Sequence, residues 1–274
     1  MIFKKMKKKI VVVYNPQKKD VNKVLNLLKK KLDKYILEYC SSLKITKEIC
    51  TGDLLLTVGG DGTLLKVGHY AIENSIAVLG INLGRLGYLA EFNVNEVFDV
   101  IEEFFNGTII PQKRNVLKVQ FRNKFYYAVN DCVIKALSAK VCDIELVINN
   151  EKIVEMICDG IIIATPTGST AYSLASGGSI VEPETEVLLI TPISPHTLSI
   201  RPIIISSTKK IELYIPEFKS NKNLILSLDG QRNFKLNQNE RIFITSSEKK
   251  MLFITNPKKS FFDILTKKLF WGIR

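Results

Sequence analysis

The sequence has few of the residues that bind metal ions or form disulfide bonds. It contains 2 histidines and 5 cysteines in 274 residues, and no two cysteines have the C-x-x-C spacing. An odd number of scattered cysteines predicts reduced, structural thiols, and so few histidines argue against a zinc site built from His and Cys.

The sequence also lacks a long hydrophobic run. The apolar segment at residues 10–14 follows a lysine-rich start and is only five residues long. A membrane span needs about 18 apolar residues and the core of a signal peptide about 7–15. We therefore expect a cytoplasmic protein with no membrane partner, in which residues 10–14 belong to a first β-strand.

Acidic residues are scarce relative to basic ones. The chain has 39 Lys and Arg against 27 Asp and Glu, which gives a formal net charge of +12. A basic surface attracts anions such as nucleotides. The lysines are spread over the whole chain, as a biased genome composition would also produce. Because no RNP, KH or zinc-finger pattern is present, we expect no nucleic-acid partner.

The first third of the chain alternates strand and helix patterns. Apolar runs predict strands at residues 9–15, 54–58 and 75–81. Helical spacing predicts helices at residues 20–35, 63–73 and 95–105, the first capped by Asp20 and the last by Asn95. This alternation predicts an α/β domain with a parallel sheet covered by helices.

From about residue 116 the pattern changes to short strands separated by turn residues. Hairpin turns are expected at residues 122–124, 149–150 and 229–230, so this part should be mostly antiparallel β. After Pro257 an apolar stripe predicts a C-terminal helix that packs back on the first domain or on a partner; its members are Phe261, Phe262, Leu265 and Leu269. We expect residues 1–112 and 257–274 to form the α/β domain and residues 113–256 a β-rich domain.

A glycine-rich loop lies directly between a predicted strand and a predicted helix. It consists of Gly59, Gly60, Asp61, Gly62 and Thr63. Glycine backbone N–H groups beside a helix N-terminus suit a phosphate group. A carboxylate repels phosphate, so Asp61 should orient or deprotonate a hydroxyl, or hold a metal. The alternative is a tight turn with Asp61 as a helix cap. The spacing fits neither a Walker nor a Rossmann loop.

A second loop is rich in small hydroxyl side chains. Asp159 and Gly160 lead into an apolar strand, and residues 165–173 (TPTGSTAYS) contain five Ser or Thr residues. These side chains offer donors and acceptors without bulk, and Tyr172 offers a flat face on which a base can stack. A plain surface loop is the alternative.

Three shorter patterns complete the set of candidates. Asn130 and Asp131 end a strand that begins at residue 126, where an amide beside a carboxylate could bind a ribose or a base, or form an ordinary turn. His196 lies in the segment SPHTLSIRP and is more easily explained as structural than as catalytic. The DGQ sequence at residues 229–231 is a hairpin turn that could also contribute Gln231 to a site.

The chain resembles the NAD kinase family in five motifs and in their order. These are the glycine loop, the Asn-Asp pair, the TPTGSTAYS block, SPHTLSIRP and DGQ. The resemblance extends from about residue 9 to residue 272, and TPTGSTAYS is its most specific motif. Lipid kinases and phosphofructokinases carry loops similar to GGDGT. Lipid kinases follow theirs with P-x-G-T-x-N-D, whereas here residues 80–89 read GINLGRLGYL.

The resemblance implies a role for each matched position. Asp61 would act as proton acceptor or orienter for the 2′-hydroxyl of the adenosine ribose of NAD, beside a phosphate loop of Gly59, Gly60, Gly62 and Thr63. The NAD-binding residues it implies are Asp61, Gly62, Lys66, Asn130, Asp131, Lys140, Asp159, Thr170, Ala171, Tyr172, Ser173 and Gln231. Many members have Glu in place of Asp131, and Ile157 stands where some members have a basic residue.

The resemblance implies ATP-dependent phosphorylation of NAD to NADP, with Mg²⁺ or Mn²⁺ as the divalent metal. It does not identify the metal ligands. The assembly it implies is a homodimer or homotetramer. The residues alone indicate only phosphoryl transfer to a nucleotide-like substrate. They leave open a related kinase that acts on a lipid or sugar hydroxyl, and a non-enzymatic binder of nucleotides or nucleic acid.

Overall fold

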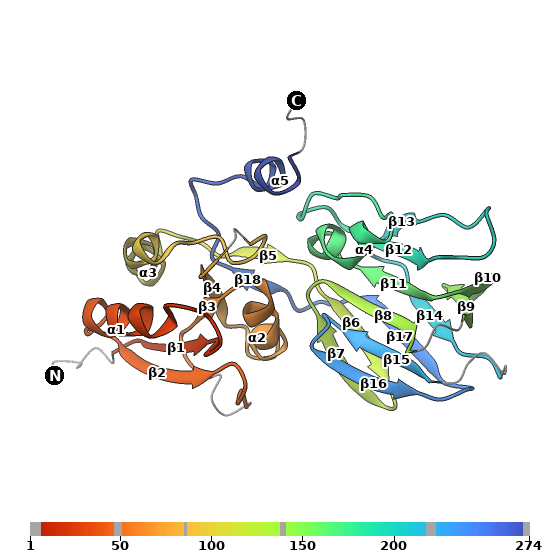
Figure 1. Cartoon of the computed structure of the whole chain (residues 1–274), viewed down its shortest axis with the longest axis horizontal. Helices are drawn as coiled ribbons and strands as arrows, with labels where there is room; N and C mark the ends of the chain where they lie inside the picture. Colours follow the sequence, from red (N-terminus) through yellow and green to blue (C-terminus); the bar gives the residue numbers. More distant parts are fainter. Residues whose placement is uncertain (1–6, 47–50, 85–86, 138–140, 218–222, 271–274) are drawn as a thin grey trace. The chain divides into compact units, whose positions relative to one another are not determined.

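The structure is a computed structural model that describes residues 7–46, 51–84, 87–137, 141–217 and 223–270. The chain divides into two compact units, drawn in Figure 1. The first comprises Met1–Lys113 and Met251–Arg274, and the second comprises Arg114–Lys250.

The first unit contains a six-stranded sheet. Its strands are β2 (Ile36–Ser41), β1 (Lys9–Tyr14), β3 (Leu54–Gly59), β4 (Ala77–Asn82), β18 (Met251–Phe253) and β5 (Gln112–Arg114), in this spatial order. The pairs β1–β2, β1–β3, β3–β4 and β4–β18 are parallel. Every residue of β3 is buried, as is usual for a central parallel strand covered on both faces.

Four α-helices accompany this sheet, namely α1 (Val21–Lys31), α2 (Asp61–Asn74), α3 (Val97–Phe105) and α5 (Phe261–Leu269). The apolar sides of α1 and α3, including Leu28 and Ile101, join the strand residues in one hydrophobic core. The predicted α/β class with a parallel sheet is confirmed.

Of the two predicted helix caps, Asp20 occupies the N-cap position of α1 as expected but its side chain does not cap the helix, and Asn95 is wrong. Asp20 has a left-handed backbone (φ 63°), makes no side-chain cap bond, and its carboxylate instead lies 2.8 Å from Lys23 Nζ. The helix expected from Asn95 is preceded by a short 3₁₀ turn (Val94–Glu96), for which Asn93 and Glu96 form the capping box. Several polar residues precede this helix, and periodicity alone does not select which one caps it.

Helix α5 belongs to the first unit, but its buried side differs from the predicted stripe. A capping box between Ser260 and Asp263 begins the helix, and Ile264 and Leu265 are buried. Phe262 is 56% exposed. The predicted stripe lies too far toward Phe262 because a helix of 9 residues, about two and a half turns, offers little pattern to locate its buried side.

The second unit consists of two antiparallel sheets. The first has the order β10 (Glu151–Cys158), β9 (Cys142–Ile148), β14 (Ile211–Tyr214), β17 (Arg241–Ser246), β6 (Leu117–Phe121) and β7 (Lys124–Ala128). The second has the order β13 (Ile203–Ser206), β12 (Val187–Ile193), β11 (Gly160–Ala164), β8 (Asp131–Ala136), β15 (Leu224–Leu228) and β16 (Arg232–Leu236). Neighbouring strands in both sheets pair antiparallel, which confirms the predicted antiparallel β class. One hydrophobic core combines residues of both sheets.

The three predicted hairpin turns are confirmed. The central residues have positive φ in each: 49° and 59° at Arg122 and Asn123, 51° and 66° at Asn149 and Asn150, and 53° and 65° at Asp229 and Gly230. Two consecutive positive φ values match the right-handed twist of the flanking strands, and Asn, Asp and Gly adopt them at low cost.

The strand expected to end in Asn130 and Asp131 is wrong. Strand β7 ends at Ala128, and Asp131 begins β8. Asn130 therefore lies in the connection between two strands. Strand β2 mixes apolar and polar residues, and β5, β13, β14 and β18 have only three or four residues each. The sequence therefore does not predict these strands, which are defined by pairing with their neighbours.

The cysteine and membrane expectations can be compared with the described residues. Cys40, Cys132, Cys142 and Cys158 are buried free thiols, while Cys50 lies outside the described residues. No helix in the described part of the chain is long and apolar enough to cross a membrane.

Candidate functional site

The glycine loop joins β3 to α2. A Cβ on Gly59 would come within 2.3 Å of Thr63 Oγ1, so close packing inside the loop requires glycine there. A Cβ on Gly60 or Gly62 would meet nothing within 4 Å, and neither residue has a positive φ. The fold itself therefore does not require glycine at these two positions, and the space beside them is open to a ligand.

Asp61 is the first residue of α2, and its carboxylate binds a separate turn of the first unit. The backbone N–H of Tyr88 donates to Oδ2 (2.8 Å), and those of Leu89 and Ala90 donate to Oδ1 (3.1 and 2.9 Å). We call residues 88–90 the Asp61 turn. A Cβ on Gly87 would lie 2.1 Å from Asp61 Oδ1, so glycine is needed immediately before this turn.

This arrangement replaces the interpretation of Asp61 as a simple helix cap, because the cap position is Gly60. A carboxylate offers about four lone-pair directions, and three N–H groups use three of them. The carboxylate is thus fixed in orientation with acceptor capacity left for one hydroxyl.

In the second unit, Asp229 forms a matching arrangement. Its Oδ2 accepts the N–H of Val129 (2.8 Å), and its Oδ1 accepts those of Asn130 and Asp131 (2.7 and 3.1 Å). Asp229 lies at the β15–β16 hairpin turn, so this turn fixes the backbone that carries Asn130 and Asp131. The DGQ pattern predicts the turn, but it does not indicate that the carboxylate of Asp229 binds this backbone.

The hydroxyl-rich loop is fixed to the same backbone. Thr165 Oγ1 donates to the carbonyl oxygen of Val129 (2.6 Å), and the N–H of Thr165 donates to the carbonyl oxygen of Asn130 (2.9 Å). A Cβ on Gly168 would lie 2.1 Å from the carbonyl oxygen of Asn130. The Asn130 connection, the Asp229 turn and the TPTGSTAYS loop are therefore assembled as one piece.

This piece forms a pocket of about 240 Å³. Its lining residues are Asn130, Asp131, Val133, Lys135, Ala171, Tyr172, Ser227, Asp229 and Gly230. Tyr172 is 38% exposed and lies beneath the ammonium of Lys135, 5.7 Å from its ring centroid. Asn130 Oδ1 is buried and has no hydrogen-bond partner among the described residues. A flat aromatic face, a cation and an unused amide oxygen suit a polar aromatic ligand.

Two carboxylates of this pocket are buried, and burial raises the pKa of both. The pKa of Asp131 rises to about 7, first because of burial and second because of the negative charge of Asp229. The pKa of Asp229 rises to about 6 through burial, opposed by its three N–H donors. Those donors favour the ionised form of Asp229, so of the two carboxylates Asp131 keeps its proton to the higher pH.

This proton makes stability depend on pH. The native state retains the proton of Asp131 between pH 4 and 7, where the unfolded chain has lost it, so the free energy of unfolding falls as pH rises through that range. Between pH 5 and 8, the free energy of unfolding should fall by roughly 3 kcal/mol less in Asp131→Asn than in wild type, because asparagine has no proton to lose. Chemical unfolding at several pH values measures this, with the exposed Glu248→Gln as control. Identical pH profiles for Asp131→Asn and wild type would contradict it.

The remaining sequence-predicted residues lie in varied surroundings. Ser173 is buried, and its hydroxyl bonds with Thr191 Oγ1 (2.8 Å). Thr170 Oγ1 donates to the carbonyl of Thr167 (3.4 Å), and Gln231 Nε2 to that of Asp229 (3.3 Å). Asp159 is exposed at the β10–β11 junction, and Lys66 is half-buried on α2. Lys140 lies outside the described residues.

Val133, Lys135 and Ser227 line the pocket but were not selected from the sequence. They lie on β8 and β15, where alternation indicates only which side of a strand each residue occupies. Exposed His196 donates its backbone N–H to the carbonyl of Ile157 (2.9 Å).

No cluster of three or more His, Cys, Asp or Glu side chains suited to a metal ion occurs in the described ranges. Mg²⁺ commonly binds through substrate phosphates with only one or two protein carboxylates.

Comparisons with known proteins extend over both units. The family model described as ATP-NAD kinase N-terminal domain matches residues 4–109, and the ATP-NAD kinase C-terminal domain matches residues 129–256. The NAD kinase of Aquifex aeolicus (strain VF5) is 38% identical over 226 residues, which are 80% of this chain and 82% of that protein. That of Thermoanaerobacter sp. (strain X514) is 39% identical over 232 residues, 82% and 81% of the two chains.

Solved structures share the fold. Yeast NADH kinase in complex with NADH has a TM-score of 0.82 at 23% identity and covers 98% of this chain and 89% of its own. An NAD kinase from Archaeoglobus fulgidus in complex with ATP has a TM-score of 0.76 at 24% identity, covering 94% and 99%. Together with the two domain matches and the relatives at 38–39% identity, these similarities show that the chain belongs to the NAD kinase family.

Proposed function

We propose that this kinase transfers the γ-phosphoryl group of ATP to the 2′-hydroxyl of the adenosine ribose of NAD. The hydroxyl oxygen forms the new P–O bond, the bond to ADP breaks, and the hydroxyl proton passes to Asp61. The observation that carries the proposal is the Asp61 carboxylate, fixed by three N–H groups beside two glycines that the fold does not require.

The loop would contribute mainly position and charge. Phosphoryl transfer has a loose transition state with charge spread over the equatorial oxygens, so correct placement and electrostatics dominate catalysis. Backbone N–H groups at the start of α2 suit those oxygens. Mg²⁺ or Mn²⁺ would enter as part of the ATP substrate and offset charge on its phosphates.

The pocket of the second unit would bind the dinucleotide. Tyr172 offers a stacking face, and Asn130 offers an unused amide oxygen that can accept a hydrogen bond from an amine or a hydroxyl. Protonated Asp131 can donate a hydrogen bond and ionised Asp229 cannot, so the pair distinguishes acceptors from donors on the ligand.

Further contacts and properties belong to the same proposal. The additional NAD contacts are Gly62, Lys66, Lys140, Asp159, Thr170, Ala171, Ser173 and Gln231. A cytoplasmic location and assembly as a homodimer or homotetramer also follow from the family resemblance. Sedimentation of the purified chain at several concentrations tests the assembly.

The purified protein with NAD, ATP and Mg²⁺ should form NADP, detected by an NADP-specific dehydrogenase. A matched reaction with 2′-deoxy-NAD should yield no product, because that substrate lacks the accepting hydroxyl. If folded protein forms no NADP with any nucleotide donor or metal, the proposal is wrong, and lipid and sugar hydroxyls become the acceptors to test.

A further inference from the structure

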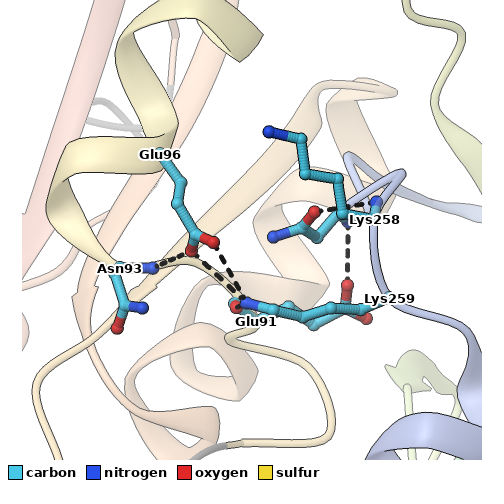
Figure 2. Close-up of polar contacts among 6 residues, drawn as sticks. Glu91, Asn93, Glu96, Lys258 and Lys259 are labelled. Atoms are coloured by element: carbon cyan, nitrogen blue, oxygen red, sulfur yellow. Dashed lines mark hydrogen bonds and ion pairs between the residues drawn. The ribbon is translucent and has the colours of Figure 1, made fainter.

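The C-terminal segment of the chain is bound to the residues that follow the Asp61 turn. The backbone N–H of Asn256 donates to Glu91 Oε2 (2.8 Å), and Lys259 Nζ donates to the carbonyl of Glu91 (2.6 Å). Figure 2 shows the same lysine directed at the carboxylate of Glu96, at 3.3 and 3.5 Å. Because Glu91 directly follows Ala90, these contacts anchor the end of the Asp61 turn to residues 256–259.

Helix α5 begins directly after this anchor and extends toward the turn itself. Its burial of Ile264 and Leu265 fixes its rotation. In this rotation Lys268 Nζ lies 4.1 Å from the ring centroid of Tyr88. Tyr88 is the residue whose backbone N–H binds Asp61 Oδ2, so the ammonium group stacks on a direct partner of Asp61.

Lys268 is half-buried, and its ammonium makes no ion pair with a carboxylate among the described residues. Burial lowers its pKa, and the negative charge of Asp61 opposes that shift. The Tyr88 hydroxyl is buried without a hydrogen-bond partner in the described part of the chain. A cation in such surroundings is costly unless its charge is used nearby.

We propose that Lys268 is a positioning residue for Asp61: its ammonium, held on the Tyr88 ring by the anchored C-terminal helix, keeps the Asp61 turn in place and offsets the charge of its carboxylate during phosphoryl transfer. The inference rests on the proposed role of Asp61. A carboxylate beside a triphosphate suffers like-charge repulsion, and a nearby cation in a partly desolvated place reduces it.

Three variants separate charge from packing. Lys268→Met keeps the apolar stem on Tyr88 and removes the charge, whereas Lys268→Arg keeps a cation that also stacks on aromatic rings. Lys267→Met makes the same change at the exposed neighbouring position on α5. Each variant is measured by kcat and KM for NAD and ATP, and by hydrogen exchange of the Tyr88, Leu89 and Ala90 amides.

A cation–π contact at such a site contributes about 0.5–2 kcal/mol, which corresponds to about a 2- to 30-fold effect. Lys268→Met should therefore lower kcat by about 2- to 30-fold with little change in either KM, and speed exchange of the three amides by a similar factor. Lys268→Arg should retain most of the wild-type kcat and most of the protection of the three amides, and Lys267→Met should resemble wild type in both.

Equal impairment of Lys268→Met and Lys268→Arg would overturn the charge role, and unchanged kcat and exchange in Lys268→Met would overturn the inference as a whole. If the wild-type protein forms no NADP, the proposed function is wrong. The exchange of the three amides, which needs no substrate, then decides alone whether Lys268 holds the Asp61 turn.

Discussion

Asp61→Asn should lower kcat by roughly 10²–10⁴-fold and leave the KM for NAD within a few fold, the range expected when a positioned proton acceptor is lost. Asparagine is the informative substitution because one side-chain oxygen can still accept the N–H groups of Leu89 and Ala90. Only the bond from Tyr88 is lost, since an amide NH₂ cannot accept it.

Steady-state kinetics with NAD and ATP measure this effect, with circular dichroism as a check on folding. Equal losses in NAD binding and in turnover would show that Asp61 binds substrate and does not act on the proton. Unchanged kcat would remove Asp61 from the mechanism.

Gly87→Ala serves as a steric companion to this variant. Its added Cβ would lie 2.1 Å from Asp61 Oδ1 and 3.0 Å from the carbonyl of Ala90, so it displaces an intact carboxylate. We expect kcat to fall more than about 10-fold, because small misplacements of reacting groups are costly. Gly84→Ala is the control, because its Cβ would meet only Asn82 Oδ1 at 4.0 Å.

Asp229→Ala should lower the free energy of unfolding by about 3 kcal/mol and weaken NAD binding more than about 10-fold. The N–H groups of Val129, Asn130 and Asp131 lose their acceptor, and each unsatisfied buried donor costs about 1–3 kcal/mol. Part of this destabilisation is offset, because the variant no longer buries a carboxylate. Binding weakens because the same backbone carries Asn130 and Asp131.

Urea unfolding and NAD titration measure the two effects. The stability and NAD affinity of Asp229→Asn should lie between those of Asp229→Ala and wild type, because one amide oxygen can still accept the N–H groups of Asn130 and Asp131. The exposed Glu248→Gln controls for loss of a carboxylate in the same unit. A stability of Asp229→Ala within about 0.5 kcal/mol of wild type would contradict the role of these bonds.

Local patterns in the sequence predicted much of the fold. The alternation of apolar runs and amphipathic segments gave the parallel sheet of the first unit. The turns at residues 122–123, 149–150 and 229–230 followed from residues that tolerate positive φ. The errors arose where several local partners compete, as at Asp20, which pairs with Lys23, and at Asn93, which caps in place of Asn95.

The candidate site was only partly predictable. The glycine loop and the TPTGSTAYS block could be selected because the residues that make them distinctive are contiguous. Lys135 and Ser227 could not, because strands distant in sequence bring them to the pocket. Lys268 could not, because a charged residue on a terminal helix ordinarily faces solvent.

The sequence alone determined the two fold classes, the position of the glycine loop at a strand–helix junction and the hairpin turns, because each depends on residues close together in the chain. The tertiary structure decided what fixes the two carboxylates. Asp61 accepts N–H groups 27–29 residues away, and Asp229 accepts others 98–100 residues away. The donors are backbone groups that every residue except proline carries, so only folding selects which of them meet each carboxylate.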